Sequence, residues 1–387
     1  MALQTLEDKF NQVASELGAQ FYEREEIIRS MLAAMIAGEH VLLIGPPGTG
    51  KSMLTRAFAD SFGLPAVFNL LLTRFTTPEE VFGAYDISAL EQGRYERNTR
   101  GKLPTAEIGF LDEIFKANSA ILNALLTMLN EREFDNGTAR VKCPLEMVVG
   151  ASNELPEDGE GLEALYDRFV VRHWVNPLKR GSLRSLLSKG GGGSTLTKLS
   201  PQEIDLARHT SSQIKLGQKV LTSLLDMKDE LAGHGIEASD RRWMKVVKIM
   251  KANAWMEQRS ELSQRDLRVA AYTLWNKPEE ISTIEAVLIN YAIPCESEAM
   301  RSSEVVDTII GEFDMSGFVI DGLTDDEQMP YLMTLKEMRK GIDPVLQHLK
   351  RLSKENPDNE TVFSCLEYVN DKRDALSNLM KKVMQLA

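Results

Sequence analysis

The chain has 387 residues, of which 43% are hydrophobic and 26% are charged, so it is long enough for two or three domains with apolar cores. Its formal net charge of −12 weighs against broad electrostatic binding to nucleic acid or to an anionic membrane. Its three cysteines form no CxxC pair, which disfavours a disulfide framework or a zinc site and predicts a reducing, cytoplasmic location. No stretch approaches the ~18 apolar residues of a membrane span, and the first residues lack the apolar centre of a signal peptide.

The first half of the chain predicts helices that alternate with short buried strands. Residues 1–38 repeat apolar positions at helical spacing. Apolar runs typical of buried strands lie at 40–44, 66–72, 107–111 and 146–151. Because helical segments separate these runs, we expect an α/β fold with a parallel sheet, an αβα core that spans residues 1–178.

The second half predicts helices only. Residues 190–193 are four glycines followed by Ser194, so 179–198 reads as a flexible linker. The run is identical to a standard engineered linker unit, and both an engineered insert and a native loop fit it. A helical lid is expected over 199–290 and a helical C-terminal extension over 291–387. Amphipathic patterns at 329–352 and 361–386 are typical of helix-bundle cores.

A phosphate-binding motif follows the first predicted strand. Residues 45–52 read GPPGTGKS and match G-x-x-x-x-G-K-[ST] in full, with a strand before and a helix after. Glycines let backbone N–H groups close around phosphates, Lys51 supplies a cation to the β- and γ-phosphates, and Ser52 offers a hydroxyl to Mg²⁺. The predicted nucleotide-binding residues are Gly45, Pro46, Pro47, Gly48, Thr49, Gly50, Lys51, Ser52 and the adjoining Met53.

Polar residues end two further predicted strands. Asp112 and Glu113 follow the run at 107–111, where Asp112 would hold Mg²⁺, directly or through water, and Glu113 would orient and deprotonate the attacking water. Asn153 follows the run at 146–151. It could hydrogen-bond the water or the γ-phosphate, and a turn-forming asparagine at a strand end is an equally good interpretation.

Together, the segments GPPGTGKS, GFLDEI, ASNE and ALYDRF occur in the order and spacing of AAA+ ATPases, and the chain resembles the MoxR family, in particular its RavA-type regulatory ATPases. The resemblance covers about residues 10–280, and further stretches carry it: FYERE at 21–25, RFTTPEEVFG at 74–83, GRYER at 93–97, the run from 111 to 132, SDRRW at 239–243 and Leu274-Trp275.

The resemblance implies roles that the residues alone do not. Asn153 would be the sensor-1 residue, and Arg168 the arginine finger that reaches the nucleotide of a neighbouring subunit; pairing of Arg168 with Asp167 or Glu163 is the structural alternative. Arg241 matches the sensor-2 arginine, and the adjacent Arg242 could take that place instead. The residue in the family's base-binding position is Tyr22. The cofactors would be ATP and Mg²⁺, and a finger that acts in trans implies a ring, a homo-hexamer.

Two segments look like family insertions. Residues 82–102 would form the helix-2 insert, and 131–141 reads as a hairpin with an Asn136-Gly137 turn. Four side chains of the first segment, Arg94, Tyr95, Arg97 and Arg100, either contact a substrate or belong to a solvated charged loop.

The function expected from the resemblance is a ring-forming ATPase that remodels or activates a client protein together with a von Willebrand factor A-type partner. The alternative is a nucleic-acid motor, a helicase or clamp loader, which the acidic balance and the lack of a basic, aromatic-rich segment disfavour. A scaffold that binds ATP but scarcely hydrolyses it is disfavoured because Lys51, Asp112, Glu113 and Arg168 are all present. A metabolic kinase would not explain the ALYDRF and SDRR segments.

Overall fold

The computed structural model describes residues 5–64, 66–156, 162–189, 196–292, 294–311, 313, 324–357 and 359–386. The chain forms two compact units, Met1–Glu285 and Ala286–Ala387. In the described part of the chain, no helix has both the length and the apolar character needed to cross a membrane. The expected α/β core, helical lid and helical extension are confirmed.

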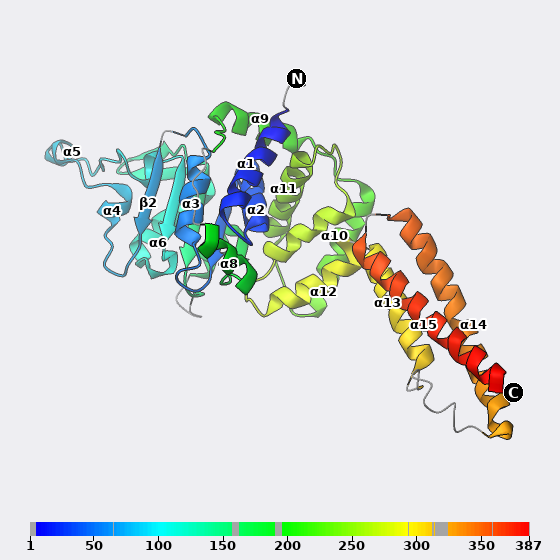
Figure 1. Ribbon diagram of the computed structural model, residues 1–387. Coiled ribbons are helices and arrows are strands. Elements are labelled where there is room, and N and C mark those ends of the chain that lie inside the picture. Colours follow the sequence, from blue (N-terminus) through cyan, green and yellow to red (C-terminus); the bar gives the residue numbers. More distant parts are fainter. Residues whose placement is uncertain are drawn as a thin grey trace. The chain divides into compact units, whose positions relative to one another are not determined.

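A five-stranded parallel sheet forms the centre of the first unit (Figure 1). In space the strands follow the order β2 (Val67–Leu71), β3 (Ile108–Asp112), β6 (Met147–Ser152), β1 (His40–Ile44) and β7 (Phe169–Trp174). Four of these strands match the apolar runs of the sequence. The fifth, β7, was not predicted, because Arg172 and His173 interrupt its apolar pattern; both side chains are buried in the structure.

Helices cover the sheet and connect its strands. These elements are α1 (Leu6–Gln20), α2 (Glu25–Ala37), α3 (Lys51–Asp60), α4 (Pro78–Phe82), α5 (Ile87–Glu91), η1 (Leu103–Thr105), η2 (Ile114–Lys116), α6 (Ser119–Glu131), α7 (Glu163–Tyr166) and α8 (Arg180–Lys189). Helix α2 is buried along most of its length because it contacts the sheet on one side and lid helices on the other. Helix α8 lies inside the range that was expected to be a linker, and the glycine run at 190–193 lies outside the described residues.

The lid contains α9 (Pro201–Ser212), α10 (Gln218–Gly233), α11 (Asp240–Met256), η3 (Gln264–Tyr272) and the start of α12 (Glu280–Ala292). The division between the two units falls within α12, a few residues before the boundary expected after residue 290. Ion pairs join the lid to the core: Arg208 Nη2 lies 2.6 Å from Glu146 Oε2, and Lys245 Nζ lies 2.7 Å from the buried Glu39 Oε2.

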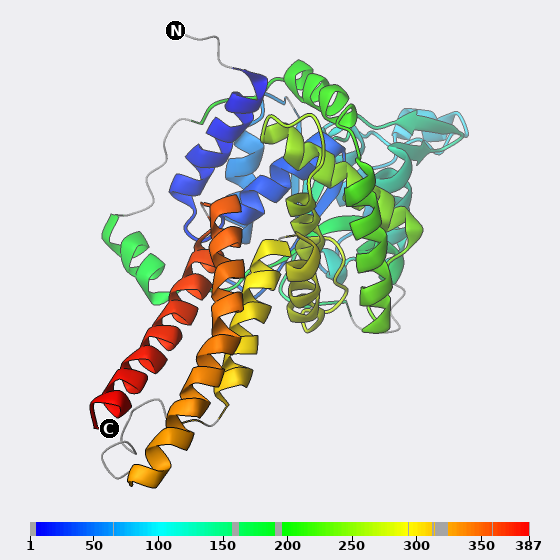
Figure 2. The same cartoon turned by 90° about the vertical axis from the view of Figure 1, so that its right-hand side faces the viewer.

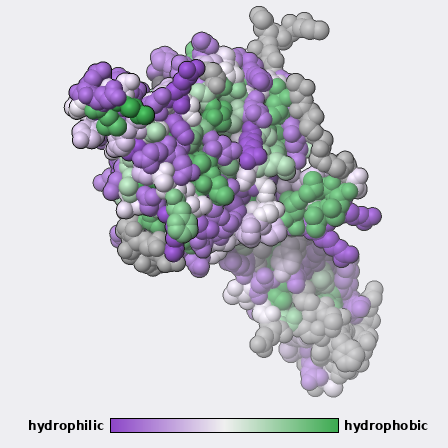
Figure 3. Space-filling model, turned by 90° about the vertical axis from the view of Figure 1, so that its left-hand side faces the viewer, coloured by the Kyte–Doolittle hydropathy of each residue, from purple (hydrophilic) through white to green (hydrophobic). Residues whose placement is uncertain are grey.

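The two expected insertions contact each other. Strands β4 (Glu133–Asn136) and β5 (Ala139–Lys142) form the expected hairpin, and its turn residue Gly137 has a φ of 68°, which favours glycine. The side chain of Asn136 accepts a hydrogen bond from Arg97 N (2.6 Å) and donates one to Arg97 O (3.1 Å). These two bonds join the segment 82–102 to the hairpin. In the space-filling view of this side, apolar side chains occur in groups between polar ones (Figure 3).

The second unit consists mainly of three long helices that lie side by side (Figure 2). They are α13 (Pro294–Ile310), α14 (Asp325–Glu355) and α15 (Glu360–Leu386). Their apolar faces form one buried cluster that includes Leu335, Leu349 and Val369. The amphipathic patterns at 329–352 and 361–386 are therefore confirmed as bundle core.

Candidate nucleotide-binding site

The phosphate-binding motif lies where β1 ends and α3 begins. Three of its glycines have positive φ values, 153° at Gly45, 80° at Gly48 and 85° at Gly50, so the loop follows a path that other residues rarely adopt. A Cβ atom on Gly45 would lie 2.3 Å from Val175 O. The loop therefore requires glycine at Gly45 for space and at all three positions for backbone conformation.

Lys51 lies beneath this loop and is largely buried. Its Nζ donates hydrogen bonds to Gly45 O (2.5 Å), Pro46 O (3.0 Å) and Asn153 Oδ1 (2.9 Å). Burial lowers the pKa of the Lys51 ammonium, and the nearby carboxylates of Asp112 and Glu113 oppose that shift. These three acceptors fix the position of the Lys51 side chain beneath the loop.

Ser52 and Asp112 bring two oxygen ligands together. Ser52 Oγ, in the first turn of α3, donates a hydrogen bond of 2.9 Å to Asp112 Oδ2 at the end of β3. A hydroxyl and a carboxylate are the kind of oxygen ligands that Mg²⁺ prefers, and Mg²⁺ usually takes only one or two protein ligands beside phosphate and water. The two residues therefore fit a magnesium ion that also binds phosphate.

Glu113 and Asn153 form the next part of the site. Asn153 Nδ2 donates a short hydrogen bond to Glu113 Oε1, while its Oδ1 accepts the bond from Lys51. Glu113 has a φ of 54°, a conformation rare for a residue other than glycine, and Lys116 Nζ lies 3.2 Å from its Oε2. The structure thus brings together Lys51, Ser52, Asp112, Glu113 and Asn153 from the ends of three neighbouring strands.

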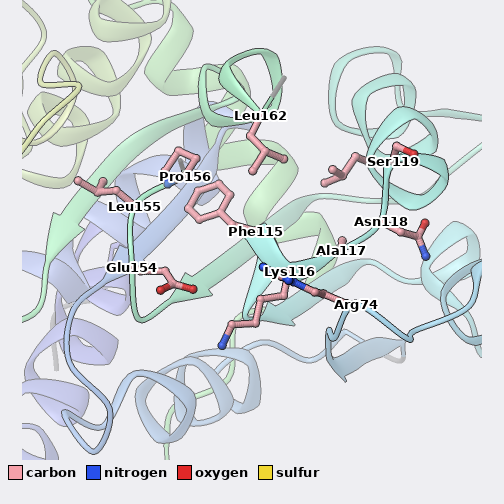
Figure 4. Close-up of a pocket in the computed structure, with 11 residues that line it drawn as sticks. Arg74, Phe115, Lys116, Ala117, Asn118, Ser119, Glu154, Leu155, Pro156 and Leu162 are labelled. Carbon is pink, nitrogen blue, oxygen red and sulfur yellow. The ribbon is translucent and has the colours of Figure 1, made fainter. Parts of the chain in front are cut away.

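Residues that follow Glu113 and Asn153 in the sequence line a cavity of about 330 Å³ (Figure 4). Its lining includes the cations Arg74 and Lys116, the carboxylate of Glu154, and apolar side chains such as Phe115 and Leu162. Lys116 therefore links this cavity to Glu113 through the ion pair described above.

A second cavity of about 320 Å³ is lined by part of the phosphate-binding loop together with Tyr22 and Met53. Leu183 and Leu186 of α8 also line this cavity. These two residues were not predicted, because 179–198 was expected to be a linker. The signal was present, since the apolar residues of α8 recur at helical spacing.

Arg24 was not among the predicted nucleotide-binding residues, although it lies close to the phosphate-binding loop. Its buried guanidinium donates hydrogen bonds to Asn176 O (2.6 Å) and Glu23 O (2.9 Å), and a long one to Thr49 O (3.5 Å). Burial lowers the pKa of this group. Arg24 therefore fixes the N-terminal segment that carries Tyr22 beside the phosphate-binding loop.

The candidate arginines form a separate cluster between α7 and the first turn of α11. Asp167 Oδ1 lies 2.8 Å from Arg242 Nη2, and Asp167 Oδ2 lies 3.6 Å from Arg168 Nη1. Arg242 is buried, whereas Arg241 is exposed and donates a short hydrogen bond to Asn130 Oδ1. Burial, and next the charge of Arg241, lower the pKa of Arg168.

Comparisons with known proteins agree with this geometry. Residues 8–213 match the family described as the MoxR domain in the MoxR-vWA-beta-propeller ternary systems, and residues 219–288 match an AAA lid domain. An uncharacterised protein of Methanocaldococcus jannaschii is 36% identical over 306 residues, which cover 79% of this chain and 80% of that protein.

Two further relatives are more distant. The chaperone MoxR1 of Mycobacterium tuberculosis is 28% identical over 153 residues, 38% of this chain and 39% of that one. The crystal structure of a candidate ATPase from Cytophaga hutchinsonii superposes with a TM-score of 0.59 at 19% identity, covering 73% of this chain and 94% of that chain. At this identity the structural likeness concerns the fold.

Proposed function

Because the chain belongs to the MoxR family of AAA+ ATPases, we propose that it binds ATP with Mg²⁺ and hydrolyses it to ADP and phosphate. The observation that carries this proposal is a series of contacts between the first residue of α3 and the residues that follow β6 and β3: Lys51 bonded to Asn153, and Asn153 bonded to Glu113. In this order, the cation suits the γ-phosphate, the amide can orient the attacking water, and the carboxylate can act as the base that takes the proton of that water.

Each residue has a defined task in this reaction. Backbone N–H groups of the loop at 45–50 and the ammonium of Lys51 would bind the phosphates. Mg²⁺, held by Ser52 and Asp112, would neutralise charge on the phosphate oxygens. Asn153 would orient the water, and Glu113 would accept its proton. The adenine of ATP would lie in the cavity lined by Tyr22, Met53 and α8.

Arg168 would complete the site of a neighbouring subunit, and Arg241 would act as the sensor-2 arginine of the lid. We assign Arg168 as the arginine finger because its guanidinium is only loosely paired, 3.6 Å from Asp167. Arg241 is exposed in the first turn of the lid helix α11, which supports a role as the sensor-2 arginine. An arginine supplied in trans accelerates phosphoryl transfer by about 10³–10⁵ in other systems, so the active form would be a ring, a hexamer.

The family description names a MoxR domain that works with von Willebrand factor A and β-propeller proteins. We therefore propose a partner with a von Willebrand factor A-type domain, and a client whose conformation or assembly changes as ATP is hydrolysed. The family match does not favour the alternative function, a nucleic-acid motor.

Phosphate release tests the ATPase proposal. Turnover should require Mg²⁺ and should fall by at least about 10²-fold in Glu113→Gln, whereas ATP binding should persist because Lys51 and Ser52 remain. Equal turnover in the parent and in Glu113→Gln would contradict the assigned base. Addition of single- or double-stranded DNA at low salt should leave the rate unchanged; a strong, salt-dependent stimulation would favour the nucleic-acid motor.

A further inference from the structure

We propose that Arg242 is a positioning residue that holds the carboxylate of Asp167 away from Arg168, so that Arg168 stays free to reach the nucleotide of a neighbouring subunit. This inference rests on the proposed role of Arg168 in trans. It concerns the lid of the same chain that carries the finger, because Arg242 lies in the first turn of the lid helix α11.

Arg242 is fixed by its surroundings. Its side chain is 3% exposed, and its two terminal nitrogens contact different residues: Nη2 lies 2.8 Å from Asp167 Oδ1, and Nη1 donates a 2.9 Å hydrogen bond to Asn276 Oδ1. Its backbone N–H donates to the hydroxyl of Ser239, the residue that caps α11. A planar guanidinium held at both ends in this way has little freedom to move toward a nucleotide.

Asn276 anchors that arrangement to the core. Its Oδ1 also accepts a hydrogen bond of 3.2 Å from Arg172 Nη1 on β7, and its backbone N–H donates to Glu280 Oε2 at 2.7 Å. Its backbone oxygen accepts a 2.8 Å bond from Tyr166 Oη, immediately before Asp167 in the chain. The segment that carries the finger is therefore bonded directly to the lid.

Arg168 is held much less firmly. Its Nη1 lies 3.6 Å from Asp167 Oδ2, beyond hydrogen-bond length, whereas both terminal nitrogens of Arg242 have close partners at 2.8 and 2.9 Å. Asp167 thus lies between two arginines and is bonded closely to only one of them. Without Arg242, the carboxylate would lose its close partner and would turn to Arg168, the other cation beside it.

This arrangement separates the two adjacent lid arginines by role. Arg241 is exposed and remains the candidate sensor, whereas Arg242 acts on Arg168 through Asp167. The sequence alone left the choice between them open, because both carry the same charge and follow each other in the chain.

Steady-state ATP turnover of assembled protein tests the proposal. In Arg242→Met, kcat should fall about fivefold, the factor expected when a partly exposed ion pair captures the finger, while KM for ATP stays unchanged. Adding Asp167→Asn to that variant removes the competing charge and should restore most of the lost kcat. If the double variant is as slow as the single one, the proposed competition is wrong.

Mixed assemblies distinguish action on the neighbour from action on the chain's own nucleotide. Subunits with Glu113→Gln lack the base but supply an intact Arg168, so mixing them with Arg242→Met subunits should raise turnover per Arg242→Met subunit toward the parent value. A purely structural defect, or a role at the chain's own nucleotide, would show no such recovery, and that result would overturn the proposal.

Two controls fix the interpretation. Lys248→Met removes a 60% exposed cation from the same helix and should leave turnover and melting temperature unchanged. The mixture of Arg168→Ala with Glu113→Gln tests the trans role itself. If that mixture fails to recover, the role of Arg168 in trans is wrong and the inference fails with it; if it recovers and the Arg242→Met mixture does not, the inference alone is overturned.

Discussion

Replacing the buried Arg172 with methionine should lower the free energy of unfolding of the first unit by about 3 kcal/mol. The side chain is fully buried and donates hydrogen bonds to Phe169 O (2.8 Å), Trp275 O (2.6 Å), Tyr166 O (3.0 Å) and Asn276 Oδ1 (3.2 Å). Without this donor, each of the three buried carbonyl oxygens would lack its hydrogen bond, and each unsatisfied acceptor lowers the free energy of unfolding by roughly 1–3 kcal/mol. Relief of the cost of burying a charge, several kcal/mol, offsets part of that sum.

Urea unfolding followed by tryptophan fluorescence measures this loss, because all four tryptophans belong to the first unit. Arg140→Met is the matched control. Arg140 lies near three carboxylates, those of Glu131 (3.0 Å), Asp135 (2.9 Å) and Glu133 (3.6 Å), but its side chain is 54% exposed, so its loss should change the free energy of unfolding much less than the loss of Arg172. An equal or smaller cost for Arg172→Met than for Arg140→Met would refute the argument that burial decides the energetic weight of these arginines.

Three further outcomes are expected. Gly45→Ala should abolish nucleotide binding, measured by fluorescent ATP-analogue titration, because its Cβ would lie 2.3 Å from Val175 O; unchanged affinity would contradict the described loop. Burial lowers the pKa of His173 from 6.5 to about 3, so its stabilising contribution is complete above pH 6.5 and is lost as the pH falls from there toward 3. His173→Gln should therefore flatten the dependence of unfolding free energy on pH in that window, and an unchanged slope would assign the dependence to other groups. Leu186→Glu should raise KM for ATP several-fold with little effect on kcat, since Leu186 lines the proposed adenine-binding cavity. A fall in kcat with unchanged KM would contradict a role of α8 in adenine binding.

The nucleotide-binding residues were predictable because they follow strands whose patterns are local. The glycines at 45–50 mark a turn, and the carboxyl ends of parallel strands meet at one edge of the sheet. Ser52 and Asp112 could therefore be expected together although sixty positions separate them, and they are 2.9 Å apart. The contact of Asn153 with both Lys51 and Glu113 favours a place in the site over a role as a turn residue alone.

Other features depended on tertiary contacts that sequence patterns do not carry. Strand β7 contains the buried Arg172 and His173, whose hydrogen bonds to distant segments allow these two polar side chains to lie in the core. Helix α8 was not predicted because the glycine run that follows it favoured a linker over the whole range 179–198. Arg241 and Arg242 could not be distinguished, because the burial of a helical residue depends on which face the neighbouring Asp167 and Asn276 cover.

The central claim is that an arginine from one subunit completes the ATPase site of the next. ATP turnover per chain, measured against protein concentration for the parent and for Arg168→Ala with light scattering alongside, tests it most directly. We predict that specific activity rises as the chains assemble, and that Arg168→Ala binds ATP and assembles but loses about 10³-fold or more in turnover. Turnover that is independent of protein concentration and unaffected by Arg168→Ala would contradict the claim.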